Sequence, residues 1–293
     1  MYKINQQITL NDGRSLGYAE YGSDSGTPVF HFHGAGSSRL ERPASEYILE
    51  QLDIRFISVD RPGHGLSDFQ TDRRLTDWPN DIAQLADHIG IDEFYVTGHS
   101  SGGPHVLVCA YQLPERIIAG AAISCVAPMS RPRAYHGMPV LNQLLARSSR
   151  SFPWFTKLIR RMMRNMVEKD VEMATRQLMS SIPDSDKDAL YDPKNVEILV
   201  ISIQEGFRQG HQGVALDDIL VNGEWAFTLQ DVKPRIDIWH GEDDVNVPFH
   251  AGQYLSDTLP NSREYFLPAK GHFFVLSRWE EIISTMIDKD QST

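Results

Sequence analysis

The chain has 293 residues, with 28 Lys or Arg against 39 Asp or Glu, which gives a formal net charge of −11. This length allows a large buried core, either in one domain that carries an insertion or in two smaller domains. The negative charge, with no basic block along the chain, repels phosphate backbones and argues against nucleic acid as a partner.

The cysteines and the apolar segments indicate a cytoplasmic protein. Cys109 and Cys125 both lie in apolar stretches, where cysteine is typical as a small buried side chain rather than as half of a disulfide. The N-terminal residues lack the apolar core of a secretion signal, and no uninterrupted apolar run approaches membrane-spanning length. We therefore expect a cytoplasmic protein without stable insertion into a membrane.

The N-terminal part of the chain predicts a hairpin followed by a buried strand. Two short alternating segments, 7–10 and 15–21, flank Asp12-Gly13, and Asp-Gly between such segments is typical of a β-hairpin. Residues 28–32 are apolar enough for a central strand and lead into His33-Gly34-Ala35-Gly36-Ser37-Ser38. Small residues at this point leave backbone N–H groups accessible to an anion.

Helical and strand patterns then alternate as far as Pro128. Thr76 is a suitable N-cap for a helix that Gly90 can end. We expect helices at 43–51, 76–90 and 104–110 and strands at 54–59, 94–97 and 117–126. Such alternation predicts parallel strands joined by right-handed crossovers.

After Pro128 the pattern becomes helical for a hundred residues and then returns to a sheet pattern. Within 129–228 we expect helices at 140–147, 153–166, 171–179, 196–207 and 216–220. Strands at 235–240 and 264–267 and helices at 248–258 and 278–288 follow. We therefore expect a core formed by residues 1–128 and 229–293 and a separate helical segment formed by residues 129–228.

The segment 153–166 is amphipathic. Trp154, Leu158, Met162 and Met166 share one face, whereas the basic side chains lie mostly elsewhere. The pattern favours a helix that packs on its neighbours, because a membrane-surface helix would need a supporting anchor of which the sequence gives no sign. Seven of the nine methionines fall within 129–228, and a methionine-rich surface suits a pocket for irregular apolar groups.

A Gly-x-Ser-x-Gly motif, Gly98-His99-Ser100-Ser101-Gly102, stands between the strand 94–97 and the helix that follows Gly103. A sharp strand-to-helix turn of this kind strains the backbone at the serine and leaves no room for side chains two residues to either side. In that setting Ser100 would be exposed at the end of a sheet.

Four segments stand in an order that resembles the α/β-hydrolase fold superfamily: His33-Gly34 after a strand, Gly98 to Gly102, Gly241-Glu242-Asp243-Asp244-Val245-Asn246-Val247-Pro248, and Gly271-His272. The run Asp60-Arg61-Pro62-Gly63-His64-Gly65-Leu66-Ser67 is similar to a loop of that superfamily as well. The resemblance implies a mostly parallel eight-stranded α/β sheet with helices on both faces. It also implies that residues 129–228 form a helical cap inserted after the sixth strand.

The resemblance further implies a catalytic triad of Ser100, Asp244 and His272. A serine hydroxyl needs a base within hydrogen-bond reach, and an imidazole has a pKa in the working range. A carboxylate must then fix the imidazole tautomer. Asp243 and Asp244 are both available after the seventh strand, and the likeness to the family pattern selects Asp244.

Backbone amides of Ala35 and Ser101 are the oxyanion-hole donors that the resemblance implies. They would bind the negative charge that develops in the tetrahedral transition state. We expect no metal and no cofactor, since His31-x-His33 lies within a strand and the oxyanion loop, where a structural role is the simpler interpretation.

The leading hypothesis is a serine esterase, a carboxylic ester or lactone hydrolase that acts through an acyl-enzyme on small to medium, largely apolar substrates. Serine rather than aspartate at position 100 argues against relatives that form alkyl-enzyme esters. Two alternatives stay open: a non-catalytic or slow-turnover receptor for a small ligand, and a carbon–carbon bond hydrolase or lyase. We expect a small-molecule ester-like substrate as the partner, and a homo-oligomer is compatible with the sequence.

Overall fold

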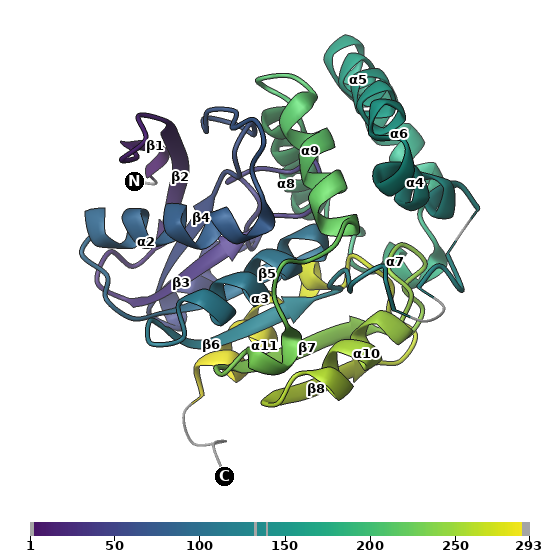
Figure 1. Cartoon of the computed structure of the whole chain (residues 1–293). Coiled ribbons are helices and arrows are strands. Elements are labelled where there is room, and N and C mark those ends of the chain that lie inside the picture. Colours follow the sequence, from purple (N-terminus) through teal and green to yellow (C-terminus); the bar gives the residue numbers. More distant parts are fainter. Residues whose placement is uncertain (1–2, 132–133, 139, 289–293) are drawn as a thin grey trace.

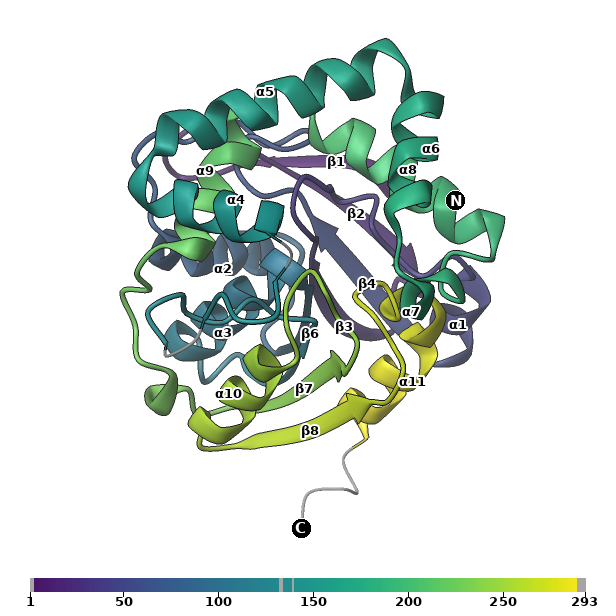
Figure 2. The ribbon, with the colours of Figure 1, turned by 90° about the vertical axis from the view of Figure 1, so that its right-hand side faces the viewer.

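One eight-stranded sheet forms the centre of the protein, with helices against both faces (Figures 1 and 2). The computed structural model describes residues 3–131, 134–138 and 140–288. The strands are β1 (Lys3–Thr9), β2 (Ser15–Gly22), β3 (Thr27–Phe32), β4 (Ile54–Val59), β5 (Phe94–His99), β6 (Ile117–Ile123), β7 (Arg235–Gly241) and β8 (Ser262–Leu267).

The strand order across the sheet is β1-β2-β4-β3-β5-β6-β7-β8. β2 runs antiparallel to both of its neighbours, β1 and β4, whereas all other neighbouring strands are parallel. Thr9 pairs with Ser15 across the Asp12-Gly13 turn, which confirms the predicted hairpin. The predicted fold class, a mostly parallel α/β sheet covered on both faces, is therefore confirmed.

Two groups of helices cover the two faces of the sheet (Figure 2). One face carries α2 (Trp78–His88), α3 (Gly103–Gln112) and α10 (His250–Thr258), and the other carries α1 (Glu46–Gln51) and α11 (Val275–Ile287). Short 3₁₀ turns lie at η1 (Leu75–Asp77), η2 (Ser100–Gly102) and η3 (Leu229–Asp231).

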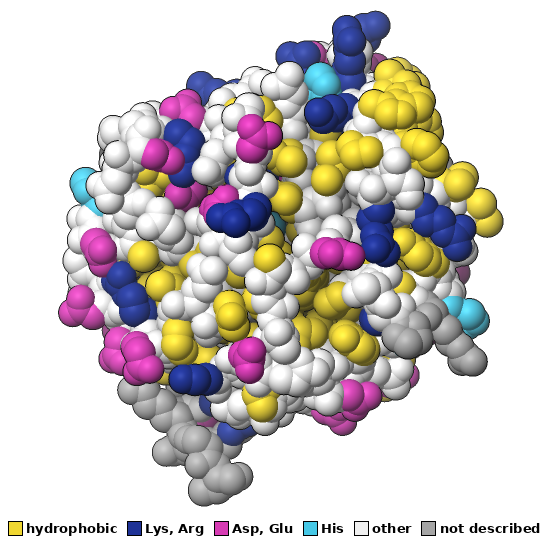
Figure 3. All heavy atoms as spheres, in the orientation of Figure 1, with side chains coloured by type: hydrophobic (Ala, Val, Ile, Leu, Met, Phe, Trp, Pro, Cys, Tyr) yellow, Lys and Arg dark blue, Asp and Glu magenta, His cyan; other side chains and the backbone are white. Residues whose placement is uncertain are grey.

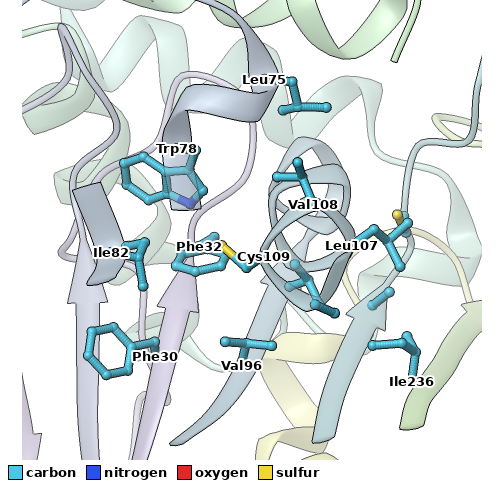
Figure 4. Close-up of a cluster of buried hydrophobic side chains, with 14 of the residues drawn as sticks. Phe30, Phe32, Leu75, Trp78, Ile82, Val96, Leu107, Val108, Cys109 and Ile236 are labelled. Carbon is cyan, nitrogen blue, oxygen red and sulfur yellow. The ribbon is translucent and has the colours of Figure 1, made fainter. Parts of the chain in front are cut away.

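Large apolar side chains fill the space between the sheet and α2 and α3 (Figure 4). Phe32 of β3 meets Trp78 of α2 edge to face with ring centroids 5.4 Å apart, and Cys109 of α3 is buried beside them as a free thiol. Complete burial of side chains of this size contributes about 1.5–3 kcal/mol each. Cys125 is also buried and free, so both cysteines occupy the environment that the sequence predicted.

A run of helices lies between β6 and β7 in the chain and beyond the carboxyl ends of the central strands (Figures 1 and 2). We call these α4 to α9 the inserted helices: α4 (Val140–Ser151), α5 (Pro153–Lys169), α6 (Val171–Ser181), α7 (Asp184–Lys187), α8 (Pro193–Gly206) and α9 (Gln212–Asn222). Their position agrees with the helical segment expected at 129–228. The division of the chain into a core domain and a cap domain stays a prediction.

The boundaries differ from expectation in a few places. The helix expected from residue 43 begins only at Glu46, because Ser45 is still extended. The helix expected from Thr76 is a 3₁₀ turn as far as Asp77, and α-helix begins at Trp78. The strand expected to reach residue 126 ends at Ile123, and α7 was not predicted. None of the helices in the described ranges is both long and apolar enough to cross a membrane.

Candidate active site

The predicted site segments follow strands whose carboxyl ends lie at one edge of the sheet. Phe32 pairs with Gly98 across β3 and β5, and Gly241 pairs with Leu267 across β7 and β8. The loops that contain Ala35, Ser100, Asp244 and His272 leave from these strand ends. In open α/β sheets this edge is where ligands bind.

Ser100 occupies the sharp turn between β5 and α3 and has a positive φ of 55°. A non-glycine residue in this region is strained and persists only where its surroundings enforce it. Close backbone contacts provide that enforcement: a Cβ added at Gly102 would lie 2.0 Å from the carbonyl oxygen of Phe32, and one at Gly98 would lie 2.5 Å from that of Gly102. Gly102 therefore lets the turn pack directly against β3, and Gly98 lets the turn close tightly on itself.

The loop after β3 holds one peptide plane in a fixed orientation. The carbonyl oxygen of Gly34 accepts hydrogen bonds from His33 Nδ1 at 2.8 Å, from Arg61 Nη2 at 3.1 Å and from the Ser37 amide at 3.3 Å. In a trans peptide the next N–H points opposite to the carbonyl, so the amide of Ala35 is directed away from these donors. Among the described groups this amide has no acceptor, and Ala35 is exposed.

Asp244 and His272 form a buried pair. His272 Nδ1 lies 2.8 Å from Asp244 Oδ2, and each residue is 5% exposed. The other carboxylate oxygen of Asp244 accepts from the amides of Asn246 and Val247, both at 2.8 Å. Asp243 is exposed, so the structure brings Asp244 rather than Asp243 to the imidazole.

The pKa values of this pair move in opposite directions. Burial alone would lower the pKa of His272, but the Asp244 carboxylate, with Asp186 and Glu41 beyond it, raises that pKa above its usual value. Burial alone would raise the pKa of Asp244, but the facing imidazole and the Val247 amide hold that pKa below its usual range. Each group therefore stabilises the charged form of the other.

His99, the residue before Ser100, links the turn at Ser100 to the loop that contains His272. Its Nε2 lies 3.2 Å from the His272 carbonyl oxygen, and the two imidazole rings are 4.9 Å apart between centroids. The Ser124 hydroxyl donates to the same carbonyl at 3.3 Å. Within the described part of the chain, no hydrogen bond joins the Ser100 hydroxyl directly to the His272 ring.

A buried carboxylate that the sequence analysis missed lies beneath the site. Glu41 Oε1 is 3.2 Å from His31 Nε2 and 3.4 Å from His99 Nδ1, and Glu41 Oε2 accepts from the Gly34 amide at 3.0 Å. Burial opposes ionisation, but the two imidazoles hold the pKa of Glu41 well below its usual range. Glu41 thus ties the loop after β3 to the residue that precedes Ser100. It lies in a loop without a motif, so sequence alone offered no signal for it.

His31 and His33 do not converge on a common point. His31 contacts Thr97 and Glu41, whereas His33 contacts the Gly34 carbonyl and the Arg61 amide. Over the described ranges, no group of three or more His, Cys, Asp or Glu side chains is arranged to hold a metal ion.

A second buried carboxylate, on the inserted helices, holds an arginine that contacts the loop after β3. Arg61 donates to the carbonyl oxygens of His33 and Gly34 and pairs through Nε with Asp217 of α9. Arg73 pairs with the other oxygen of Asp217. Burial opposes ionisation, yet the two guanidinium groups hold the pKa of Asp217 well below its usual range. Loss of one partner from a buried pair of this kind typically costs about 3–5 kcal/mol.

A third buried carboxylate reaches the histidine loop from α7. Asp186 is fully buried, and its Oδ1 accepts from the Phe273 amide at 2.6 Å. Gly271 leaves the space for this carboxylate, because a Cβ there would lie 2.4 Å from Asp186 Cγ. The Gly271 amide also donates to the Ser185 carbonyl oxygen at 3.1 Å. Two residues of the inserted helices therefore fix the backbone on either side of His272.

A surface hollow of about 580 Å³ lies next to this region. Its walls are the segment 183–185, the loop 242–245 and the start of α10. Ser100 and His272 are not among its lining residues. The hollow therefore does not border the turn at Ser100 and is not the predicted apolar pocket.

We predict that Asp186→Asn lowers the pKa of His272. Asparagine keeps an oxygen for the Phe273 amide but removes the negative charge that favours the imidazolium. NMR titration of the His272 ring protons measures the shift. Asp184→Asn is the matched control, because Asp184 is on the same helix but is exposed and pairs with Lys187. An unchanged pKa in Asp186→Asn would contradict the electrostatic role of Asp186.

Comparisons with known proteins agree with this geometry. Residues 29–285 match the model of the Alpha/beta hydrolase family. The chain is 26% identical over 278 residues to the dihydrolipoyllysine-residue acetyltransferase component of an acetoin cleaving system from Pseudomonas putida, covering 94% of this chain but 66% of that protein. It is 24% identical over 273 residues to a bifunctional esterase/perhydrolase from Acinetobacter calcoaceticus, covering 90% of this chain and 92% of that protein.

A solved structure of similar fold is a thermophilic esterase from Thermogutta terrifontis. The TM-score is 0.67 at 18% identity, over 96% of this chain and 97% of the esterase. The family match extends over most of the chain, from β3 into α11. The protein therefore belongs to the alpha/beta hydrolase family.

Proposed function

We propose that the protein is a serine hydrolase that cleaves carboxylic esters or lactones through an acyl-enzyme. The observation that carries this proposal is the buried Asp244–His272 hydrogen bond, which lies at the same sheet edge as the strained turn at Ser100. The similarity to a bifunctional esterase/perhydrolase and to a thermophilic esterase also supports ester chemistry.

The proposed first step is attack by Ser100 Oγ on the acyl carbon. In the tautomer whose Nδ1–H donates to Asp244, His272 Nε2 carries a lone pair and takes the serine proton as the new C–O bond forms. The carbonyl π-bond opens at the same time, and its electron pair moves to oxygen as the tetrahedral intermediate forms. Catalytic hydrogen bonds are often long before substrate binds, which fits the missing Ser100–His272 contact.

The amides of Ala35 and Ser101 are the proposed oxyanion donors. The Gly34 carbonyl oxygen accepts three hydrogen bonds, and these fix the orientation of the Ala35 N–H. Ser101 lies at the start of η2, where helical amides have no earlier carbonyl to which they can donate. Loss of one oxyanion-hole donor typically costs about 2.7–4 kcal/mol of transition-state stabilisation. The paired arrangement therefore favours an acyl transfer over simple ligand binding.

The second half of the reaction releases both products. The His272 imidazolium gives its proton to the leaving alkoxide as the C–O bond of the substrate breaks, which leaves the acyl group on Ser100. The same imidazole then takes a proton from a water molecule as the water oxygen attacks the acyl carbon. The imidazolium returns that proton to Ser100 Oγ as the acyl–serine C–O bond breaks, which frees the carboxylic acid and the serine. Asp244 stays ionised throughout and stabilises the imidazolium in each half.

We predict that a fluorophosphonate probe labels Ser100 and that Ser100→Ala abolishes both labelling and hydrolysis of p-nitrophenyl butyrate. Removal of the nucleophile should lower turnover roughly 10⁶-fold. Mass spectrometry of the labelled peptide and a spectrophotometric assay provide the measurements. Ser277→Ala is the control, since Ser277 is an exposed serine on α11. Labelling at another serine, or undiminished hydrolysis by Ser100→Ala, would refute the proposal.

We also predict different effects at the two neighbouring aspartates. Asp244→Asn should reduce kcat about 10⁴-fold, because asparagine neither fixes the imidazole tautomer nor stabilises its cation. Asp243→Asn should leave kcat within about twofold of wild type, as expected for an exposed side chain. Steady-state kinetics on the same ester, with circular dichroism to verify folding, decide between them. The reverse pattern would move the acid to Asp243.

A further inference from the structure

Apolar side chains are concentrated on the outer surface of the inserted helices. Among the described residues, twelve large hydrophobic side chains are exposed, and eight of these lie within residues 140–173. Figure 3 shows hydrophobic side chains gathered at the upper right of the molecule, over α4 to α6, with Lys and Arg side chains beside them. Scattered exposed apolar residues need no explanation, but a contiguous group marks an interaction site.

On α5 the exposed apolar residues form one stripe. Trp154, Leu158 and Met162 follow one another at four-residue spacing and are 65%, 44% and 63% exposed. The opposite side of the helix holds it to the protein: Thr156 is buried, and Arg160 pairs with Asp218 of α9. The expectation that the apolar face would pack on its neighbours is therefore wrong for these three residues.

A row of basic side chains runs alongside this stripe. Residues 140–169 contain seven Lys or Arg and a single acidic residue, Glu168, in a chain whose net charge is −11. Lys157 and Arg161 are exposed, lie four residues apart on the edge of the stripe, and have no ion-pair partner within the described ranges. An apolar face with Trp, Leu and Met beside a cationic face is typical of a helix that lies in a membrane interface.

Exposed apolar residues on α4, and at the junction of α4 and α5, supply the supporting anchor of which the sequence gave no sign. Val140 and Leu144 of α4 are 73% and 53% exposed, and Phe152 between α4 and α5 is 58% exposed. Since α4 packs beside α5, these side chains add to the apolar surface that Figure 3 shows over α4 to α6. We define the α4–α5 surface as Val140, Leu144, Phe152, Trp154, Leu158 and Met162 with Lys157 and Arg161.

We propose that the α4–α5 surface docks reversibly on an anionic lipid bilayer. The charge of the surface selects this occupant over a second copy of the chain. A twofold-symmetric contact would pair the α4–α5 surface with a copy of itself, which has no acidic residue to pair with Lys157 and Arg161. An anionic bilayer instead attracts each basic residue and accepts the apolar stripe at the headgroup boundary. The proposal does not depend on the proposed hydrolase function.

The test is co-sedimentation of the full chain with vesicles of phosphatidylcholine that contain about 30 mol% phosphatidylglycerol, compared with vesicles of phosphatidylcholine alone. The wild-type chain should bind the anionic vesicles, bind the neutral ones far less, and lose binding as salt rises. The double variant Lys157→Glu with Arg161→Glu should weaken binding roughly 30-fold or more. Trp154→Ser with Leu158→Ser should weaken it at least about tenfold.

Matched controls separate local from general effects. Lys194→Glu with Lys233→Glu makes the same charge change at two exposed lysines outside the patch, and Tyr191→Ser removes an aromatic side chain that is 90% exposed elsewhere. Both controls should bind as wild type, and thermal melts should show every variant folded. Failure of the wild type to bind anionic vesicles, or equal losses in the controls, would overturn the proposal. A dimer that Trp154→Ser with Leu158→Ser dissociates, without vesicle binding, would assign the surface to a second copy.

Discussion

The candidate site depends on one imidazole and one carboxylate that are held together out of water. A buried charge is costly unless it is paired and hydrogen-bonded. Asp244 meets that condition through His272 on one oxygen and two backbone amides on the other. The pair in turn needs its loops held still, and the strained turn at Ser100 shows how tightly the neighbouring backbone is packed.

Three further buried carboxylates hold the loops around that pair, and two of them come from the inserted helices. Asp217 holds Arg61 against the loop after β3, while Asp186 accepts a hydrogen bond from the amide after His272. Glu41 joins the loop after β3 to His99. The inserted helices therefore hold the loop after β3 and the loop that contains His272 through buried carboxylates, while their outer surface is apolar and basic.

The sequence predicted what short-range patterns can encode. Alternation and turn residues located every strand of the sheet, and the glycines around Ser100 predicted a turn that the structure contains. It did not reveal α7, because a four-residue helix is too short for helical periodicity. Asp186, Glu41 and Asp217 lack a motif, and their roles arise only from contacts between distant segments. The amphipathic pattern of α5 located its apolar stripe, but periodicity cannot tell which face of a helix the rest of the protein covers.

The most direct test of this account is the pH dependence of kcat/KM for ester hydrolysis by the wild-type chain from about pH 5 to 9. In the proposed mechanism His272 must be neutral to accept the serine proton, and its pKa is raised by Asp244 against the opposing effect of burial. Activity should therefore be lost at low pH and rise through one ionisation with a midpoint above about 6.5, the usual value for histidine. A flat profile over this range, or activity that falls as the imidazole loses its proton, would contradict the assignment of His272 as the base.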